Sequence, residues 1–408
     1  MPEQAPWRFQ KIIRPMVNQE TGHHLLRGRV LTCVDDQIIE DGIVEIEGST
    51  IKKVGPASEF GTSADDAIQT NGTILPGLVQ SHGHLAWDGI HDLAAQAMND
   101  APELSAYKCA SNMLINLRAG VTTFRDLGMN KTNLVAKQAV AQGIFPGPRL
   151  IVCGEAIIQT GGHTYWCCRE ASGADEMRRA VREQVRGGAD LIKIMACHDT
   201  LEFTDDELEA VVDEAHRNGL TVTAHATFDS CISRCVLAGV DVIEHGGSMS
   251  AETIALLVER NVPIVTTFAP VVVQSQPEIA RKFNIPDWKI AERQKQVADT
   301  SRYQGLVDAA KAGVTIVFGT DCGSPAVAHD VIAPELAFMI KVGVKKDAYD
   351  AIRSATIVAA RMSKLDSKIG TLEAGKLADV IVVDGNPLED INAIGSVRMT
   401  FLEGKRMV

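Results

Sequence analysis

Six side chains able to bind a metal ion are spread along the middle of the chain, each at or near the end of a short apolar segment. Two of them form the pair His82-Gly83-His84. Residues two apart on a strand point to the same side, so this pair can hold one ion, and imidazole is a common ligand of zinc-type metals. A single histidine or aspartate of this kind is more often an ordinary core, surface or helix-capping residue. The shared placement of all six predicts a metal site: His82, His84, Lys193, His225, His245 and Asp321.

Lys193 needs a separate argument, because a protonated lysine has no lone pair and repels cations. It lies between Leu191-Ile192 and Ile194-Met195, where a charged amine without a partner is costly to bury. One interpretation is a lysine whose amine reaches out from a buried strand. The other is carboxylation by CO2, which would convert the amine into an anionic oxygen ligand able to bridge two ions.

Eight short β-branched runs alternate with segments of helical character and carry these residues. Near-continuous apolar strands that alternate with helices indicate a parallel sheet covered by helices, and eight such units fit one closed barrel. We therefore expect an α/β fold, a (β/α)8 TIM-type barrel whose functional residues lie at the carboxyl ends of the strands; an open doubly wound sheet is the alternative. Thr204 to Glu207 predicts a capping box opening a helix that ends near Asn218-Gly219. The runs begin at Ile74, Val121, Arg149, Asp190, Thr221, Val240, Val262 and Val314.

The two ends of the chain have a different pattern. Before Leu75 and after about Ile369, short segments punctuated by glycine read as antiparallel strands and hairpins. We expect both ends to form one small β-sandwich domain. The predicted boundaries are residues 1–75 and 366–408 for this domain and 76–365 for the barrel.

Composition excludes several classes of function. The chain has 408 residues, 45% of them hydrophobic, and a formal net charge of -12. This charge disfavours nucleic acid and anionic membranes as partners. The opening MPEQAPWRFQ lacks a signal-peptide core and no apolar stretch approaches a membrane span, so we expect a cytoplasmic protein. The nine cysteines show no disulfide or zinc-ribbon spacing and are expected to be reduced, and a homo-oligomer is expected.

Several motifs resemble those of the amidohydrolase superfamily. They are LPGLVQSHGHL, Lys193 in GGADLIKIM, His225 in VTAHA, His245 in VIEHG and Asp321 in FGTD. The segment GTLEAGKLADVIVVDGNPLED is similar to the one that closes the terminal β domain of that family. The resemblance extends from about Val30 to the end of the chain.

The resemblance implies a site with two divalent metal ions, most typically zinc. His82, His84 and Asp321 would bind the more buried ion, His225 and His245 the more exposed one, and carboxylated Lys193 would bridge them. Water activated between the ions would attack an amide carbonyl. Asp321 would take the proton from the water and pass it to the leaving amine.

Within this superfamily, the chain is most similar to the branch with imidazolonepropionase-like enzymes, Xaa-Pro dipeptidases and carboxypeptidases releasing basic residues. Gly161-Gly162-His163 resembles a motif of that branch, in which His163 would donate a hydrogen bond to the substrate carbonyl; an exposed loop histidine is the alternative. We expect further substrate contacts from side chains suited to a carboxylate or an apolar group, although each could instead be packing: Tyr165, Trp166, Arg169, His329 and Arg125. The long segments after the first and seventh strands are large enough to act as lids.

Two departures from the family pattern are visible. Gln80 stands where an acidic residue usually precedes the first histidine of the pair, so the hydrogen-bond partner of His82 is expected to differ. Thr227 stands where the dipeptidase branch often has tyrosine.

The leading hypothesis is a binuclear amidohydrolase acting on a dipeptide (Xaa-Pro-like) or an N-acyl amino acid, a small molecule with an amide bond and a carboxylate. A mononuclear deaminase or cyclic-amide hydrolase is the second, but deaminases of this superfamily have glutamate where this chain has Phe228. A metal-free barrel serving as an oligomeric scaffold is the third.

Overall fold

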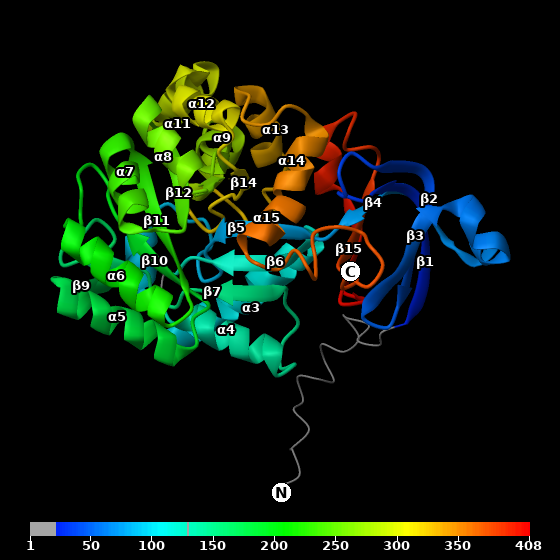
Figure 1. Cartoon of the computed structure of the whole chain (residues 1–408), viewed down its shortest axis with the longest axis horizontal. Coiled ribbons are helices and arrows are strands. Elements are labelled where there is room, and N and C mark those ends of the chain that lie inside the picture. Colours follow the sequence, from blue (N-terminus) through cyan, green and yellow to red (C-terminus); the bar gives the residue numbers. More distant parts are fainter. Residues whose placement is uncertain (1–21, 129) are drawn as a thin grey trace, which may run out of the picture.

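The centre of the molecule consists of parallel strands in two sheets (Figure 1). The computed structural model describes residues 22–128 and 130–408. One sheet is three-stranded, with β5 (Leu78–Gly83), β6 (Val121–Asp126) and β7 (Arg149–Val152). The other is seven-stranded, with β14 (Ile316–Phe318), β13 (Ile264–Thr266), β12 (Val242–Ser248), β11 (Thr221–Phe228), β10 (Leu191–Met195), and the short β8 (Ile157–Gln159) and β9 (Arg169–Ala171).

The two parallel sheets are joined at both edges. At one edge the backbone N–H of Asp190 donates to the carbonyl of Val152 over 2.7 Å, linking β7 to the start of β10. At the other edge Gly83 pairs in parallel with Cys322, and the N–H of Asp321 donates to His82 over 2.8 Å. This α/β arrangement is consistent with the expected closed barrel.

Helices cover the outer side of these strands (Figure 1). The strands are buried, and many of their side chains are apolar, as with Ile194, Ala224 and Ile243, because each strand lies between the covering helices and the interior of the barrel. The helices are α3 (Pro102–Arg118), α4 (Thr132–Ala141), α5 (Ala174–Gly187), α6 (Asp205–Arg217), α7 (Asp229–Ala238), α8 (Ala251–Glu259), α12 (Gln304–Ala312), α13 (Ala333–Val342), α14 (Ala348–Ser354) and α15 (Ile357–Met362).

Helix α6 begins as the sequence predicts. Thr204 and Glu207 form a capping box, in which the Thr204 backbone N–H donates to the Glu207 carboxylate over 2.9 Å. The helix ends at Arg217, followed by Asn218 as its C-cap. The predicted capping box is therefore confirmed.

The long segments after the first and seventh strands are mostly helical. After β5 the chain forms α2 (Leu93–Asn99) and then α3. After β13 it forms α9 (Ala269–Gln274), α10 (Pro277–Ala280), η3 (Arg281–Phe283), α11 (Asp287–Ala298) and η4 (Thr300–Tyr303).

Both ends of the chain meet in a second, mixed sheet of seven strands, in the order β17-β16-β15-β4-β1-β2-β3. Its strands are β1 (His23–Leu31), β2 (Ile38–Glu47), β3 (Thr50–Pro56), β4 (Ile68–Pro76), β15 (Val380–Asp384), β16 (Val397–Leu402) and β17 (Lys405–Arg406). Strand β4 pairs with β15 in antiparallel register, with Thr73 opposite Val383. The pairing of β1 with β4 is parallel, because the chain returns through η2 (Ala57–Asp66) instead of a hairpin. The mixed sheet is consistent with the expected small β-sandwich domain. Residues 1–21, which include the opening segment and part of that predicted domain, lie outside the described residues.

The first predicted run, ILPGLV, is divided between the two parts of the molecule. Ile74 to Pro76 end β4 of the mixed sheet, and Leu78 begins β5 of the parallel sheet. Gly77 lies between them, and a Cβ there would come within 2.2 Å of the Thr122 hydroxyl. The close approach of β6 to this joint therefore requires glycine.

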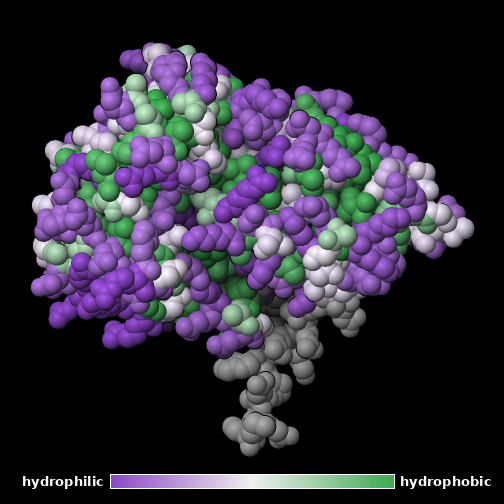
Figure 2. Space-filling model, in the orientation of Figure 1, coloured by the Kyte–Doolittle hydropathy of each residue, from purple (hydrophilic) through white to green (hydrophobic). Residues whose placement is uncertain are grey.

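The face of the molecule in Figure 2 is largely polar. Hydrophilic side chains cover much of the visible face, interrupted by apolar patches (Figure 2). Within residues 22–128 and 130–408, no helix combines the length and the apolar character that crossing a membrane demands.

Candidate active site

A cavity of about 270 Å³ opens at the carboxyl ends of the parallel strands. All six predicted metal-binding side chains line it, although they come from five different strands or strand ends. The predicted catalytic residue His163 lines it as well. The structure thus brings together His82, His84, Lys193, His225, His245, Asp321 and His163.

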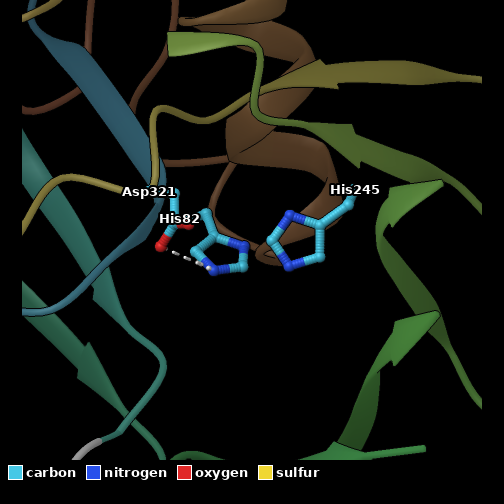
Figure 3. A group of neighbouring side chains, drawn as sticks. All are labelled: His82, His245 and Asp321. Carbon is cyan, nitrogen blue, oxygen red and sulfur yellow. Dashed lines mark ion pairs between the residues drawn. The ribbon is translucent and has the colours of Figure 1, made fainter. Parts of the chain in front are cut away.

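Three of these residues form a tight group. One ligand atom each from His82, His245 and Asp321 lies within 4.8 Å of the others (Figure 3). The Nε2 atom of His82 is 3.5 Å from the Asp321 carboxylate. Two imidazoles and a carboxylate at this spacing can hold a divalent ion.

His84 and His225 extend this group on either side. The Nε2 atom of His84 is 3.1 Å from Asp321, and its Nδ1 atom is 2.9 Å from the carbonyl oxygen of Gly128. The ring of His225 lies 4.5 Å from that of His245, centre to centre. Four imidazoles around one carboxylate offer more ligand atoms than a single ion needs.

The backbone at two of these residues is unusual. His245 has φ of 69° and Asp321 has φ of 57°, both in the left-handed region that disfavours side chains other than glycine. Backbone strain of this kind clusters at functional sites, where the surrounding structure holds it in place. Gly247, two residues after His245, is needed for packing, because a Cβ there would lie 1.9 Å from the carbonyl oxygen of Thr227.

Burial sets the protonation of the ligand atoms. Burial lowers the pKa of His225 and of His245 well below the ordinary histidine value, and neighbouring cationic groups lower both further. Burial alone would raise the pKa of Asp321, but the hydrogen bond from His84 and the nearby charges hold it below its usual value. Against the effect of burial, Asp321 and nearby acceptors instead raise the pKa of His84. The lowered pKa values of His225, His245 and Asp321 favour neutral imidazoles and an ionised carboxylate at these three residues, the forms that bind metals.

Lys193 is fully enclosed and lacks a partner. Its side chain is 2% exposed, and its Nζ atom has no hydrogen bond within the described part of the chain. Burial lowers the pKa of this amine. An orphaned amine among metal-ligand side chains fits a lysine that carries a further group, and only a neutral amine can react with CO2. The donor set as a whole fits divalent metal ions.

Glu244, which the sequence analysis did not single out, orients His82. Its carboxylate accepts a hydrogen bond from His82 Nδ1 over 2.7 Å and another from Arg125 over 2.6 Å, and it also contacts the Thr223 hydroxyl. Burial would raise the pKa of Glu244, but Arg125 and His82 hold it well below its usual value. A carboxylate on the far nitrogen fixes which nitrogen of a histidine faces the metal.

Gln80 has a different contact from the acidic residue expected at its position. Its amide donates to the Thr320 hydroxyl over 2.7 Å and accepts from the Thr320 backbone over 3.0 Å. The carboxylate that contacts the His82 ring is Glu244 of β12, and Gln80 of β5 contacts His82 only by accepting from its backbone N–H, over 3.4 Å. The sequence feature that could have indicated Glu244 is its position as a charged residue inside the apolar run VIEHG.

His163 is held at the cavity by Glu202, a second residue that the sequence did not reveal. The Nδ1 atom of His163 is 2.7 Å from the Glu202 carboxylate, and the ring stacks on His198. Burial lowers the pKa of His163. Glu202 opposes this shift without reversing it, and its contact with Nδ1 fixes the orientation of the ring at the cavity.

Three predicted substrate-binding residues, all in the described part of the chain, do not line this cavity. Tyr165 is 54% exposed, and Arg169 is paired with Glu183 over 2.8 Å. His329 is buried behind the site, where it contacts Asn116 and the carbonyl of Trp87. Arg125 does meet a carboxylate, but it is that of Glu244. Of the aromatic residues in the loop, Trp166 reaches the cavity.

Comparison with known families agrees with this geometry. Residues 73–407 match the model of the amidohydrolase family, so the chain belongs to this family and is a hydrolase acting on carbon–nitrogen bonds. The group of His82, His245 and Asp321 corresponds to a metal site typical of amidohydrolases.

Similar proteins include an ochratoxinase, a Xaa-Pro dipeptidase and a prolidase. Ochratoxinase from Aspergillus niger is 31% identical over 360 residues, which cover 78% of this chain and 71% of the relative. A Xaa-Pro dipeptidase crystallised with methionine in its active site has a TM-score of 0.79 at 27% identity, with 94% of this chain and 99% of that chain covered. A prolidase in complex with N-methylphosphonate-L-proline has a TM-score of 0.80 at 28% identity, with the same coverage.

Proposed function

We propose that this protein is a binuclear metal-dependent amidohydrolase that cleaves the amide bond of a dipeptide, such as a Xaa-Pro dipeptide, or of an N-acyl amino acid. The observation that carries this proposal is the convergence of all six ligand-type side chains and His163 on one cavity. The prolidase and dipeptidase among the similar structures support the choice of substrate class.

The residues divide into two ligand sets with one bridge. His82, His84 and Asp321 would hold one ion, His225 and His245 the other, and Lys193 carboxylated by CO2 would contact both. Two divalent ions, with zinc as the expected metal, supply a water that is deprotonated at neutral pH and polarise the scissile carbonyl.

The protein's own side chains handle the proton and the carbonyl oxygen. Asp321, ionised in this site, accepts the proton of the attacking water and delivers it to the leaving nitrogen. His163, held by Glu202, donates a hydrogen bond to the carbonyl oxygen as negative charge develops there. Glu244 keeps the His82 ring in the orientation that presents Nε2 to the site.

A panel of dipeptides and N-acyl amino acids, incubated with zinc-loaded protein, tests this function. We expect a new carboxylic acid and a free amine in equal amounts, and about two ions per chain by elemental analysis. Release of ammonia from an aminated ring, with one ion per chain, would instead favour the deaminase, although Phe228 offers no carboxylate for that reaction. No hydrolysis and less than one tightly bound ion would favour the scaffold.

The proposal retains other expectations from the sequence. These are a cytoplasmic location, a homo-oligomeric state, and a barrel bounded by residues 76–365. Gel filtration with light scattering measures the oligomeric state directly.

A further inference from the structure

A second cavity, of about 540 Å³, adjoins the first. His225, His245 and Asp321 line both cavities. A substrate whose scissile bond lies at these three residues can therefore extend one end into each cavity. The character of the two cavities then decides which end goes where.

Two arginines in the wall of the second cavity have no acidic partner. Arg293 lies on α11 and Arg302 on η4, both in the helical segment after β13. Within residues 22–128 and 130–408, neither forms an ion pair with a carboxylate. Burial lowers the pKa of Arg293 and the charge of Arg302 adds to this, while Glu292 opposes it. Two like charges near each other, one of them partly buried, favour the binding of an anion.

Tyr303 adds an unused hydrogen-bond donor to the same wall. The residue is 8% exposed, and its hydroxyl has no hydrogen-bond partner among the described residues. Buried tyrosine hydroxyls are normally paired, so this one is available to a ligand in the cavity that it lines.

The position of Arg293 is fixed before any ligand binds. Its Nε atom donates to Gln274 over 3.1 Å, and Gln274 donates to the carbonyl of Pro325 over 2.8 Å. Pro325 follows Asp321 in the same loop. The guanidinium is therefore tied to the loop that carries the proposed proton acceptor, which favours specific recognition of a carboxylate.

The first cavity has the opposite character. Trp87, Leu93, Trp166 and Met195 form an apolar wall, and the Trp87 and Trp166 rings lie 5.9 Å apart, centre to centre. Such a wall suits an apolar or aromatic group.

We propose that Arg293, Arg302 and Tyr303 bind the carboxylate of the leaving amino acid, while the acyl group lies in the cavity lined by Trp87 and Trp166. This assignment rests on the proposed amide hydrolysis and states which end of the substrate lies in which cavity. It makes a free carboxylate a requirement of the substrate, and it places that requirement on residues outside the metal site.

Paired ligands test the assignment on the zinc-loaded full-length protein. The probes are L-phenylalanine and L-proline, the leaving amino acids of such a cleavage, each compared with its carboxamide by titration calorimetry, because the enzyme would consume an N-acyl substrate during the titration. We expect Arg293→Gln and Arg302→Gln each to weaken binding of the acids about 10- to 100-fold and to leave binding of the carboxamides within about twofold. Tyr303→Phe is expected to weaken binding of the acids by about three- to tenfold. Zinc content should stay unchanged in all three variants.

Lys289→Gln is the matched control, because Lys289 is a partly exposed cation on the same helix that does not line the cavity. Arg302 is exposed, so its substitution is expected to leave folding intact, which a thermal melt verifies. Equal affinity of the unmodified protein for acids and carboxamides would overturn the assignment. A loss of acid binding in Lys289→Gln as large as in the arginine variants would also overturn it.

The substrate panel separates this inference from the proposed reaction. Hydrolysis that is equally fast for acids and carboxamides, and unaffected by both arginine substitutions, would contradict the proposed carboxylate site. The proposed amidohydrolase function would still be supported. Binding of the acids through the arginines, without hydrolysis of any amide, would support the carboxylate site and contradict the proposed reaction.

Discussion

Lys193 is the residue whose surroundings are least compatible with its ordinary chemistry. A cationic amine buried without a partner among candidate metal ligands is unfavourable, whereas a carboxylated amine would complete the site. The role of this residue can be tested by removing it and supplying its carboxylate separately.

We expect Lys193→Ala to lose nearly all hydrolytic activity and at least one bound ion per chain. Short carboxylic acids such as acetate or propionate should restore part of both, because they can occupy the space of the missing bridge. Activity and zinc content are measured across a series of acid concentrations. Full activity in the variant without added acid would contradict the bridging role.

Glu244 should raise the affinity of the site for metal although it is not a proposed metal ligand. Glu244→Gln weakens the hydrogen bond that orients His82, so zinc affinity is expected to fall about 10- to 100-fold. Competition with a fluorescent chelator measures this affinity. Glu252→Gln, in the exposed first turn of α8, is the control. An unchanged affinity in Glu244→Gln would contradict the proposed role of Glu244 in orienting the His82 ring.

The sequence revealed the six ligand-type residues because they share a type and a place at strand ends. It did not reveal Glu244, which directly precedes His245 on β12, because alternation predicts that neighbours on a strand point to opposite sides. The left-handed backbone at His245 breaks that rule, and nothing in the local sequence announces it. Arg293 and Arg302 were missed because they lie on helices of a long segment, where spacing does not indicate which face meets the site.

At the scale of elements, Glu335 links α13 to the segment after β13. Its carboxylate accepts a hydrogen bond from the Ala269 backbone over 2.6 Å, at the start of α9. Burial raises the pKa of Glu335 to about 8, although the backbone donors of Phe268 and Ala269 oppose the shift. The folded protein therefore keeps a proton that the unfolded chain releases near its ordinary value of 4.5.

This difference predicts a pH dependence of stability. The free energy of unfolding should fall as pH rises from about 4.5 to about 8, by at most about 1.4 kcal/mol per pH unit. Glu335→Gln keeps the acceptor and cannot ionise, so its stability should fall less over the same interval. Urea unfolding at pH 5.5 and 7.5, with both proteins at equal metal content, measures the two slopes. Equal slopes would mean that Glu335 is ionised throughout.

The elements were predictable where periodicity and capping agree, as at α6, whose capping box is formed by Thr204 and Glu207. They were less predictable where one apolar run serves two sheets. The run ILPGLV holds the breaker pair Pro76-Gly77 at the point of division, but the pair does not indicate that the two halves join different sheets. Gly77 is also required by Thr122, which lies 45 positions further along the chain. Contacts between distant segments of this kind have no local signature.

At the scale of the whole molecule, Arg149 joins the parallel strands to the mixed sheet through ion pairs with two carboxylates. Arg149 begins β7 and bonds Asp379 over 2.7 Å, just before β15, and also Glu403 over 2.7 Å. Asp379 is 3% exposed, and burial raises its pKa while Arg149 opposes the shift.

Removing the arginine would leave a buried carboxylate without its partner. We expect Arg149→Met to lower the free energy of unfolding by on the order of 3 kcal/mol, measured by urea denaturation at pH 7. Arg149→Met combined with Asp379→Asn should be less destabilised than the single variant. A single variant as stable as the unmodified protein would contradict a stabilising role of the Arg149 ion pairs.

The strand order of the mixed sheet also means that this sheet can be completed only late in synthesis. Strands β1 to β4 leave the ribosome first, yet the partner of β4 is β15, close to the other end of the chain. Until β15 arrives, one edge of β4 has no hydrogen-bonding neighbour, and apolar residues such as Leu26 and Ile74 lack the packing that Val380 and Val382 provide. A nascent chain of this enzyme therefore exposes an unpaired strand edge, prone to aggregation, through most of its translation. Protection by chaperones would matter until the final strands emerge.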